Sequence, residues 1–338
     1  MMEKMEKSVS IIIPNYQGAT TIAKCLEAAL ASRYQNFEVI VVDDGSVDNS
    51  VEVIKDFPCK LVQMERHGGA AQARNIGAAH SRGDILFFTD SDCLLQEDTL
   101  SIASQTFFLA EPNTVVGGSY TRIPFDSGFF SLFQSVFIHY SETREEQHPD
   151  YLATHALVID AASFRKSGGF SETFLPILED VDFSHRLRQA GYRLVMNPAI
   201  QVQHIFNFSL YRSLRNAIRK SMYWTVYSLK NNDVFADSGT ASIGLKTNVA
   251  AWFSCAFFLL AFLFTDYRVF ILFTPLILAI NLLMNRGLLA AFYRTKGSLF
   301  SLTATGYYLL LYPVAVGIGA LAGLARYFSS VRALRENA

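Results

Sequence analysis

The fold is decided by the stretch Asp84-Ile85-Leu86-Phe87-Phe88-Thr89-Asp90-Ser91-Asp92. Its apolar run has the length of a strand and ends in two carboxylates separated by one residue, so it predicts a buried β-strand with negative charge at its end. Two such carboxylates are commonly neutralised by a hard divalent cation, and the phosphates of a substrate can complete its coordination. The stretch therefore predicts a metal-dependent site that handles phosphate groups.

Alternating strand and helix patterns surround this stretch. Further strands are expected at Ser8–Ile13, Glu38–Val42 and Lys60–Met64. Helices are expected at Thr20–Ala31, Asp48–Asp56 and Ala70–His80. This alternation predicts an α/β fold of the Rossmann-like kind, a mostly parallel sheet with helices on both faces. Ligands of such sheets bind beyond the carboxyl ends of the strands, where Pro14-Asn15-Tyr16, Asp43-Asp44 and Asp90-Ser91-Asp92 lie.

Two classes of protein are excluded by what the sequence lacks. No G-x-G-x-x-G follows the first strand and no G-x-x-x-x-G-K-[ST] occurs, so dinucleotide and P-loop sites are disfavoured. The chain has 29 Lys and Arg against 30 Asp and Glu, a net charge of −1, so no nucleic-acid partner is expected. Its four cysteines show neither metal-ligand spacing nor a paired framework and are interpreted as free thiols.

The second half of this region is less regular. Strands are expected at Val115–Tyr120, Tyr151–Ile159, Tyr192–Met196 and Ala199–His204, with a helix from Leu178 to about Ala190. The segment Phe129–Tyr140 places aromatic side chains near one helical face, and core packing or membrane contact explains that stripe better than a cofactor site.

The C-terminal part is apolar. The three segments Val249–Thr265, Val269–Asn285 and Thr303–Ala325 are almost free of charge and long enough, or nearly so, to cross a bilayer core of about 30 Å. Before them, the basic and aromatic segment Leu210–Lys230 is typical of a helix in the headgroup interface, in contact with membrane lipids. Whether the third segment spans or re-enters is left open, because Arg residues follow it on the outer side if it spans.

These patterns divide the chain into a catalytic domain at residues 1–205, an interfacial amphipathic segment at 206–246 and a transmembrane region at 247–338. Met1–Lys7 is charged and lacks the apolar core of a signal peptide, so the first domain is expected to face the cytoplasm from a multi-pass protein of the cytoplasmic membrane.

Six motifs fall in one order along residues 8–205. They are Pro14-x-Tyr16, Asp43-Asp44-Gly45-Ser46-x-Asp48, Gly68-Gly69-x-x-x-Ala73-Arg74-Asn75, Asp90-Ser91-Asp92, Gly168-Gly169-Phe170 and Glu179-Asp180-Val181-Asp182. As a set they resemble the family 2 glycosyltransferases. The resemblance implies a GT-A fold, a nucleotide-sugar donor, a divalent cation (Mg²⁺ or Mn²⁺) and inversion at the anomeric carbon.

The resemblance also implies roles for individual residues. Asp44 would hydrogen-bond the nucleotide base, Asp92 would bind the metal and Asp180 would be the general base. The remaining expected site residues are Pro14 and Tyr16 beside the base, Arg74, Asp90 and Ser91 along the donor, Glu179 beside the acceptor or donor sugar, and His204 as a further metal ligand.

The expected activity is transfer of one sugar, or a few, from a nucleotide-sugar donor to a hydroxyl of a lipid-linked or cell-envelope glycan, at the cytoplasmic face of the membrane. Two alternatives remain open. A polyprenyl-phosphate glycosyltransferase would need no strong base, because its acceptor is already a phosphate. A catalytically silent glycan-binding or scaffold subunit would need none of the carboxylates Asp44, Asp92 and Asp180.

Overall fold

A computed structural model describes residues 7–172, 175–264 and 270–336. The chain forms two compact units. The sheet unit comprises Met1–Ser127 and Glu142–Asn207, and the helical unit comprises Gly128–Ser141 and Phe208–Ala338. The first six residues and the positions 265 and 269, at the ends of two expected spans, lie outside the described residues.

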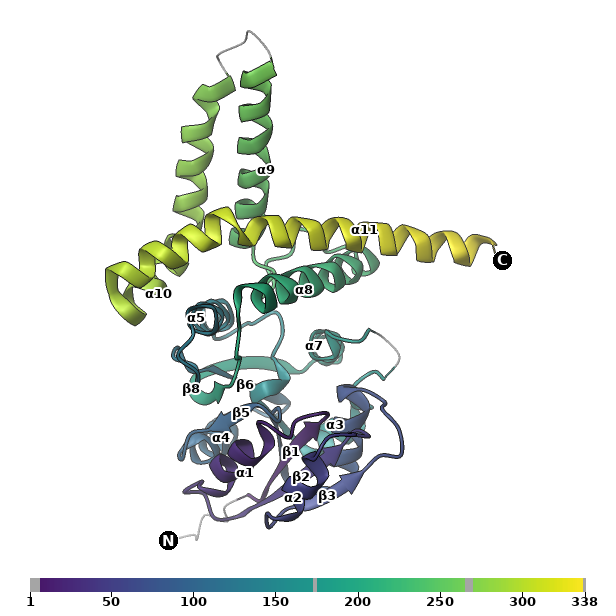
Figure 1. Cartoon of the computed structure of the whole chain (residues 1–338). Coiled ribbons are helices and arrows are strands. Elements are labelled where there is room, and N and C mark those ends of the chain that lie inside the picture. Colours follow the sequence, from purple (N-terminus) through teal and green to yellow (C-terminus); the bar gives the residue numbers. More distant parts are fainter. Residues whose placement is uncertain (1–6, 173–174, 265–269, 337–338) are drawn as a thin grey trace. The chain divides into compact units, whose positions relative to one another are not determined.

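The described part of the sheet unit contains an eight-stranded mixed sheet in the order β3-β2-β1-β4-β7-β6-β8-β5 (Figure 1). Its strands are β1 Val9–Asn15, β2 Phe37–Asp43, β3 Lys60–Gln63, β4 Ile85–Phe88, β5 Cys93–Leu95, β6 Thr114–Tyr120, β7 Leu157–Asp160 and β8 Arg193–His204. The strands β3, β2, β1 and β4 are parallel, whereas β7 runs antiparallel to β4 and to β6. All four residues of β4 are buried, as its apolar run predicts.

Helices pack against this sheet. They are α1 Ile22–Leu30, α2 Ser50–Lys55, α3 Ala70–Ala79, α4 Thr99–Leu109, α6 Ala161–Lys166 and α7 Glu179–Gln189. At Gly77 an added Cβ would lie 2.5 Å from the Ile12 side chain and 3.2 Å from that of Val42, so the glycine lets α3 lie directly on β1 and β2. The mixed sheet with its helices confirms the predicted α/β class.

Two expectations for the second half of this unit were wrong. Tyr151–Ile159 is not one strand, because Thr154–Ala156 forms a 3₁₀ turn and β7 begins only at Leu157. The two expected strands that flank Pro198 are a single strand, β8. A bulge between Gly117 and Ser119 of the neighbouring β6 gives the proline a place where the regular ladder is already interrupted.

An aromatic cluster fixes the start of α7 in the core of the sheet unit. The ring of Phe88 lies 5.2 Å from that of Phe170, and Phe170 lies 4.6 Å from Phe183 on α7. Phe164 of α6 packs against all three rings at 5.1 to 5.5 Å. Because all four side chains are buried, this cluster holds the first turn of α7 near the end of β4.

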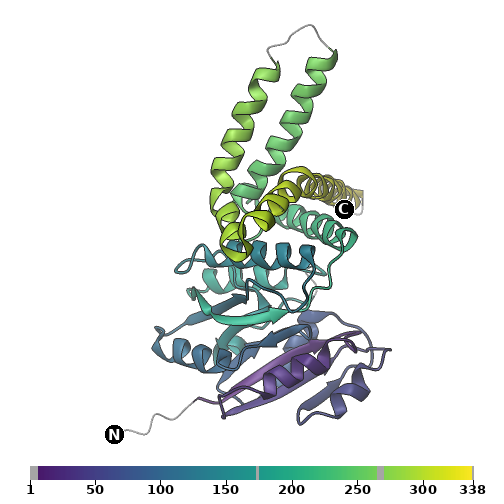
Figure 2. The same ribbon diagram turned by 60° about the vertical axis from the view of Figure 1, so that its left-hand side comes forward.

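The helical unit contains α5 Phe129–Thr143, most of which belongs to it, α8 Leu210–Asn231, α9 Ile243–Phe264, α10 Phe270–Leu310 and α11 Tyr312–Glu336. Helical geometry breaks inside α10 at Lys296 and Gly297. The first part of α10 runs beside α9 (Figures 1 and 2). Phe133 and Phe137 of α5 are buried and their rings contact Tyr308 and Tyr312, which confirms core packing for the aromatic stripe.

Two helical segments, Ile243–Phe264 and Phe273–Ser330, are long and apolar enough to cross a membrane, by length and composition. The expected third span falls in the second of them. This expected third span includes the first part of α11, and α11 lies along α8. Gly319 and Gly323 allow this approach, because a Cβ would lie 2.4 and 2.5 Å from the carbonyl oxygens of Ile218 and Met222. The third segment is therefore packed on the basic helix α8.

Candidate active site

Three strand ends meet at one edge of the sheet, as the sequence predicts. Asn15 at the end of β1 pairs in register with Asp43 at the end of β2, and its amide donates to the Asp43 carboxylate at 2.8 Å. Asp90 follows β4, the other neighbour of β1. Ser91 is half-buried in the turn that leads to β5. The polar groups of distant motifs therefore converge at this edge.

The carboxylate of Asp44 anchors the loop before α3. It accepts hydrogen bonds from the backbone N–H groups of Gly68 and Gly69, at 2.6 and 2.8 Å, and lies 2.9 Å from Nδ1 of His67. Gly69 has a φ of +93°, which a side chain would strain, and it caps the N-terminus of α3. A buried anion there is favoured by the helix dipole. A contact from Asp44 to a base stays a prediction.

An aromatic stack borders the same loop. The ring of Tyr16, 47% exposed, lies 4.0 Å from that of His67 at an interplanar angle of 27°. Pro14, the second-last residue of the strand β1, is half-buried. Because His67 also contacts Asp44, the stack joins the first two sequence motifs to the third. His67 was not among the expected site residues.

Arg74 joins two acidic motifs that lie about ninety residues apart in the sequence. Its guanidinium donates to Asp90 at 2.6 Å and to Glu179 at 2.6 Å, from a side chain only 4% exposed. Although burial would lower the pKa of Arg74, the two carboxylates raise it above its usual value. Burial alone would raise the pKa of Asp90, but Arg74 holds it below its ordinary range. The structure therefore pairs Arg74 with Glu179, a contact that the sequence did not predict.

Asp92 and His204 meet because β5 pairs with β8. Cys93 lies opposite His204 in the antiparallel register, and Nε2 of His204 lies 3.4 Å from the Asp92 carboxylate. Ligand atoms of Asp92, Cys93 and His204 all lie within 4.8 Å of one another. Burial raises the pKa of Asp92, and the charge of His204 opposes this. Among the described residues, these three form the group of His, Cys, Asp or Glu side chains that lie close enough together to hold a metal ion.

The donor set fits a divalent cation. A carboxylate oxygen suits Mg²⁺ and Mn²⁺, whereas an imidazole nitrogen suits transition metals, so the pair favours Mn²⁺ over Mg²⁺. Burial raises the pKa of the Cys93 thiol well above its usual value, and its Sγ donates to Asp92 at 3.8 Å. A protonated thiol is a poor ligand. Asp92 and His204 are therefore the two side chains of this group that could hold such an ion, and Cys93 contacts the Asp92 carboxylate.

A second layer of aromatic and charged groups supports His204. The ring of Tyr120 lies 4.9 Å from His204, edge to face, and stacks on His155 at 3.9 Å. Nε2 of His155 lies 3.3 Å from Glu142, with both side chains 6% exposed. Burial lowers the pKa of His155, but Glu142 and then Asp90 and Asp180 raise it above its ordinary value. No sequence pattern predicted this layer, because its members come from three separate segments.

Asp180 lies in the first turn of α7. Its Oδ1 accepts a hydrogen bond from the N–H of Val181 at 2.9 Å, and the side chain is half-buried. Leu178, just before the helix, has a φ of +75°, so the chain turns sharply into α7. The next acid, Asp182, is paired with Arg186 at 3.0 Å. The other neighbouring acid of Asp180, Glu179, pairs with Arg74 at 2.6 Å.

The model of the protein family described as "Glycosyl transferase family 2" matches residues 10–168 of this chain. Glycosyltransferase GlyG of Streptococcus pneumoniae is 32% identical over 131 residues, which cover 37% of this chain and 44% of that protein. An uncharacterised glycosyltransferase of Haemophilus influenzae is 32% identical over 187 residues, 54% of this chain and 62% of that protein. The chain thus spans about half the length of these relatives.

A solved structure shares the fold. It is the mannosyltransferase PcManGT from Pyrobaculum calidifontis in complex with GDP-Man and Mn²⁺, with a TM-score of 0.56 at 20% identity over 96% of this chain and 88% of that one. At this identity the likeness shows the fold alone, and it confirms the GT-A architecture. The order of motifs, the sheet and the match at residues 10–168 agree, and this chain carries a family 2 glycosyltransferase domain.

Proposed function

We propose that the protein transfers a sugar, with inversion, from a nucleotide-sugar donor to a hydroxyl of a lipid-linked or cell-envelope glycan at the cytoplasmic face of the membrane. The observation that carries this proposal is the buried Arg74, which holds Asp90 and Glu179 on its two sides at 2.6 Å each. It brings the expected donor motif and the expected acceptor motif to one place. A site that both binds a donor and activates an acceptor needs this proximity.

The donor would lie along the strand ends. The exposed Tyr16 and His67 rings offer an apolar face for a nucleotide base, and Asp44 fixes the loop that carries His67. The named donor of PcManGT is GDP-Man, and the sequence here does not select among nucleotides or sugars. Asp92 and His204 would hold a divalent cation that offsets charge on the diphosphate leaving group. Asp90, which pairs with Arg74, would contact the donor ribose.

Asp180 would accept the proton of the acceptor hydroxyl. A single displacement needs one base on the face of the sugar opposite the leaving group, and a positioned carboxylate typically contributes about 10²–10⁴-fold in rate. The Val181 N–H donates to Asp180 at the N-terminus of α7, where the helix dipole favours a negative charge. Glu179 is committed to Arg74, so we assign it to positioning and leave the proton transfer to Asp180.

The test compares two substitutions in one helix turn. Asp180→Asn should lower transfer by at least about 10²-fold while donor binding is retained, because the amide cannot accept the proton. Asp182→Asn is the matched control, since Asp182 pairs with Arg186, and it should keep activity within a few-fold. Transfer by the purified full chain would be measured with a panel of nucleotide sugars. Undiminished transfer by Asp180→Asn would remove Asp180 from the role of base.

Removal of the metal gives a second test. We expect a chelator to stop donor turnover and Mn²⁺ to restore it at lower concentration than Mg²⁺, since the site includes an imidazole. Asp92→Asn should raise the Mn²⁺ concentration needed for half-maximal rate, whereas Asp98→Asn, before α4, should not. Turnover that is indifferent to chelator would contradict the metal assignment.

A further inference from the structure

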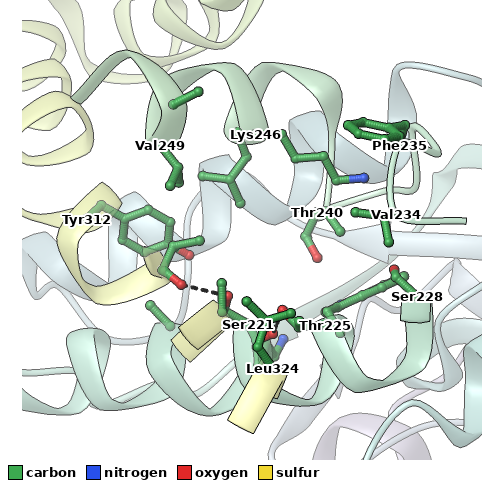
Figure 3. Close-up of a pocket in the computed structure, with 18 of the residues that line it drawn as sticks. Ser221, Thr225, Ser228, Val234, Phe235, Thr240, Lys246, Val249, Tyr312 and Leu324 are labelled. Atoms are coloured by element: carbon green, nitrogen blue, oxygen red, sulfur yellow. Dashed lines mark hydrogen bonds between the residues drawn. The ribbon is translucent and has the colours of Figure 1, made fainter. Parts of the chain in front are cut away.

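The helical unit contains a pocket with a volume of about 430 Å³. Its walls are α8, α9, α11, the connection 232–242 and two residues of α5. Figure 3 shows Val249 on α9, Tyr312 on α11 and Val234 in the connection around the space. The lining is mostly apolar, and the volume lies within the range of about 300–1,000 Å³ that is usual for ligand sites.

The polar groups of the wall are largely engaged with the protein itself. The Ser221 hydroxyl donates to the carbonyl oxygen of Val316 at 2.7 Å, a bond drawn in Figure 3, and Thr225 donates to Ser221 within α8. The ammonium of Lys246 donates to the carbonyl oxygen of Ala236. A water molecule in a cavity needs two to four polar partners, and cavities without them stay dry and take apolar guests. The wall therefore suits a hydrocarbon occupant.

One polar atom in the wall is not satisfied by the protein. Gln134 of α5 lines the pocket with its side chain 2% exposed, and its Oε1 has no hydrogen-bond partner among the described residues. A buried acceptor that is left without a hydrogen bond destabilises the structure. An occupant that donates an O–H to this atom would remove that destabilisation. The occupant is therefore expected to combine a long apolar part with a hydroxyl-bearing head.

The charges near the pocket are positive. Lys220 and Lys246 both contribute to its lining. The helix α8 carries five basic residues and no acidic one. The wall also includes the first turns of α9, which is apolar and long enough to cross a membrane. These features favour an anionic head on a membrane lipid.

We propose that this pocket binds one hydrocarbon chain of a membrane lipid whose head is a phosphate monoester. Its negative charge would be met by Lys220, and the remaining P–O–H would donate to Gln134. A phosphate monoester has a second pKa of about 6, so an O–H is present in a fraction of molecules at neutral pH. The inference concerns binding in the helical unit and does not depend on the proposed transfer reaction.

The sequence provides a reporter at the site. Of its two tryptophans, Trp224 lines the pocket and Trp252 lies on α9 outside the lining. Trp252→Phe leaves Trp224 as the sole fluorophore, and Trp224→Phe leaves Trp252. The full chain in detergent would be titrated with a bromine-labelled hexadecyl phosphate, whose bromine quenches tryptophan at short range. We expect quenching of Trp224 that saturates with probe concentration. Quenching of Trp252 should only rise in proportion to the amount of probe in the micelle.

Substitutions separate the apolar and the charged parts of the site. Ala320→Phe fills the pocket from α11 and should weaken probe binding at least about tenfold, whereas Ala322→Phe, exposed on the same helix, should not. Lys220→Gln should weaken binding of hexadecyl phosphate about tenfold and leave hexadecanol unchanged. Lys230→Gln, exposed near the end of α8 and not part of the wall, is its control.

Several results would overturn the proposal. Quenching of Trp224 that never saturates, or that Ala320→Phe leaves unchanged, would mean that the chain does not enter the pocket. Equal affinity for hexadecyl phosphate and hexadecanol would show that the phosphate head does not contribute to binding. Because no nucleotide sugar is present in these titrations, failure of the transfer proposal would leave them unchanged, and Asp180→Asn should bind the probe as well as the unaltered chain.

Discussion

The sheet unit and the helical unit each join distant segments through a buried polar cluster, but with different chemistry. In the sheet unit the cluster is ionic, with Arg74 between Asp90 and Glu179. In the helical unit it is neutral. Asn248 of α9 accepts from Asn281 at 2.8 Å, and Asn285 accepts from the Tyr308 hydroxyl at 2.9 Å. These four residues, which we call the amide cluster, are each at most 4% exposed.

The difference corresponds to the medium each unit is built for. A buried cation between two carboxylates is tolerable where water reaches one side, and it leaves ionic groups at the carboxyl ends of the strands. Between apolar helices a charge costs much more, so amides and hydroxyls join the helices instead. The chemistry of the buried contacts thus agrees with the apolar composition of α9 and α10, independently of their length.

The largest effect is expected from removing the cation. Arg74→Met leaves Asp90 and Glu179, whose side chains are 31% and 14% exposed, without their cation, and loss of one partner of a largely buried ion pair costs about 3–5 kcal/mol. Protection of the α3 and α7 backbone amides against hydrogen exchange in the full chain should therefore fall by more than about 100-fold. Amides of α9 and α10 should keep their protection.

A surface pair supplies the control for Arg74. Arg33 and Glu97 lie 2.7 Å apart with side chains 74% and 60% exposed, so Arg33→Met should cost under about 1 kcal/mol. Equal losses from Arg33→Met and Arg74→Met would show that the bridge contributes no more than an exposed pair. Arg74→Lys keeps the charge but not the two-sided guanidinium geometry, and its loss should lie between the two.

How far the sequence predicts this architecture depends on whether a signal is local. The strand β4, which precedes Asp90, is encoded by its own apolar run, and the helix α3, which follows Gly69, by its own periodicity and the glycine; both were predicted closely. The short strand β5 was not predicted. Its three residues form a strand because β8, about a hundred residues later, pairs with them.

The same distinction applies to the site. Asp92 and His204 were predicted as partners through the resemblance to a family, and the pairing of β5 with β8 explains their approach. The contact between Arg74 and Glu179, and the layer of Tyr120 and His155, depend on side chains that meet only in the folded sheet. No spacing along the chain encodes such contacts, which is why the sequence did not predict them.

A smaller effect is expected in the helical unit. Asn285→Leu keeps the volume but removes bonds to Tyr308, Asn281 and the Gly244 carbonyl. Hydrogen bonds between membrane helices are worth about 0.6 kcal/mol on average and up to about 1.7, so protection of α9 and α10 amides should fall by about three- to twentyfold. Sheet-unit amides should not change. Thr303→Val, which removes a bond within its own helix, is the control, and an equal loss there would contradict the inter-helix role.

The smallest effect is a pH dependence that only the sheet unit should show. The pKa of His155 is raised in the folded chain, so the stability it adds is fully present below its unfolded pKa of about 6.5 and is lost as pH rises through the folded value. Protection factors near Glu142 should fall by about threefold through that window, within the limit of about 1.4 kcal/mol per pH unit that one proton sets. His155→Gln should abolish the fall. The amide cluster has no group that titrates there, so a similar fall in α9 would contradict the contrast between ionic and neutral contacts.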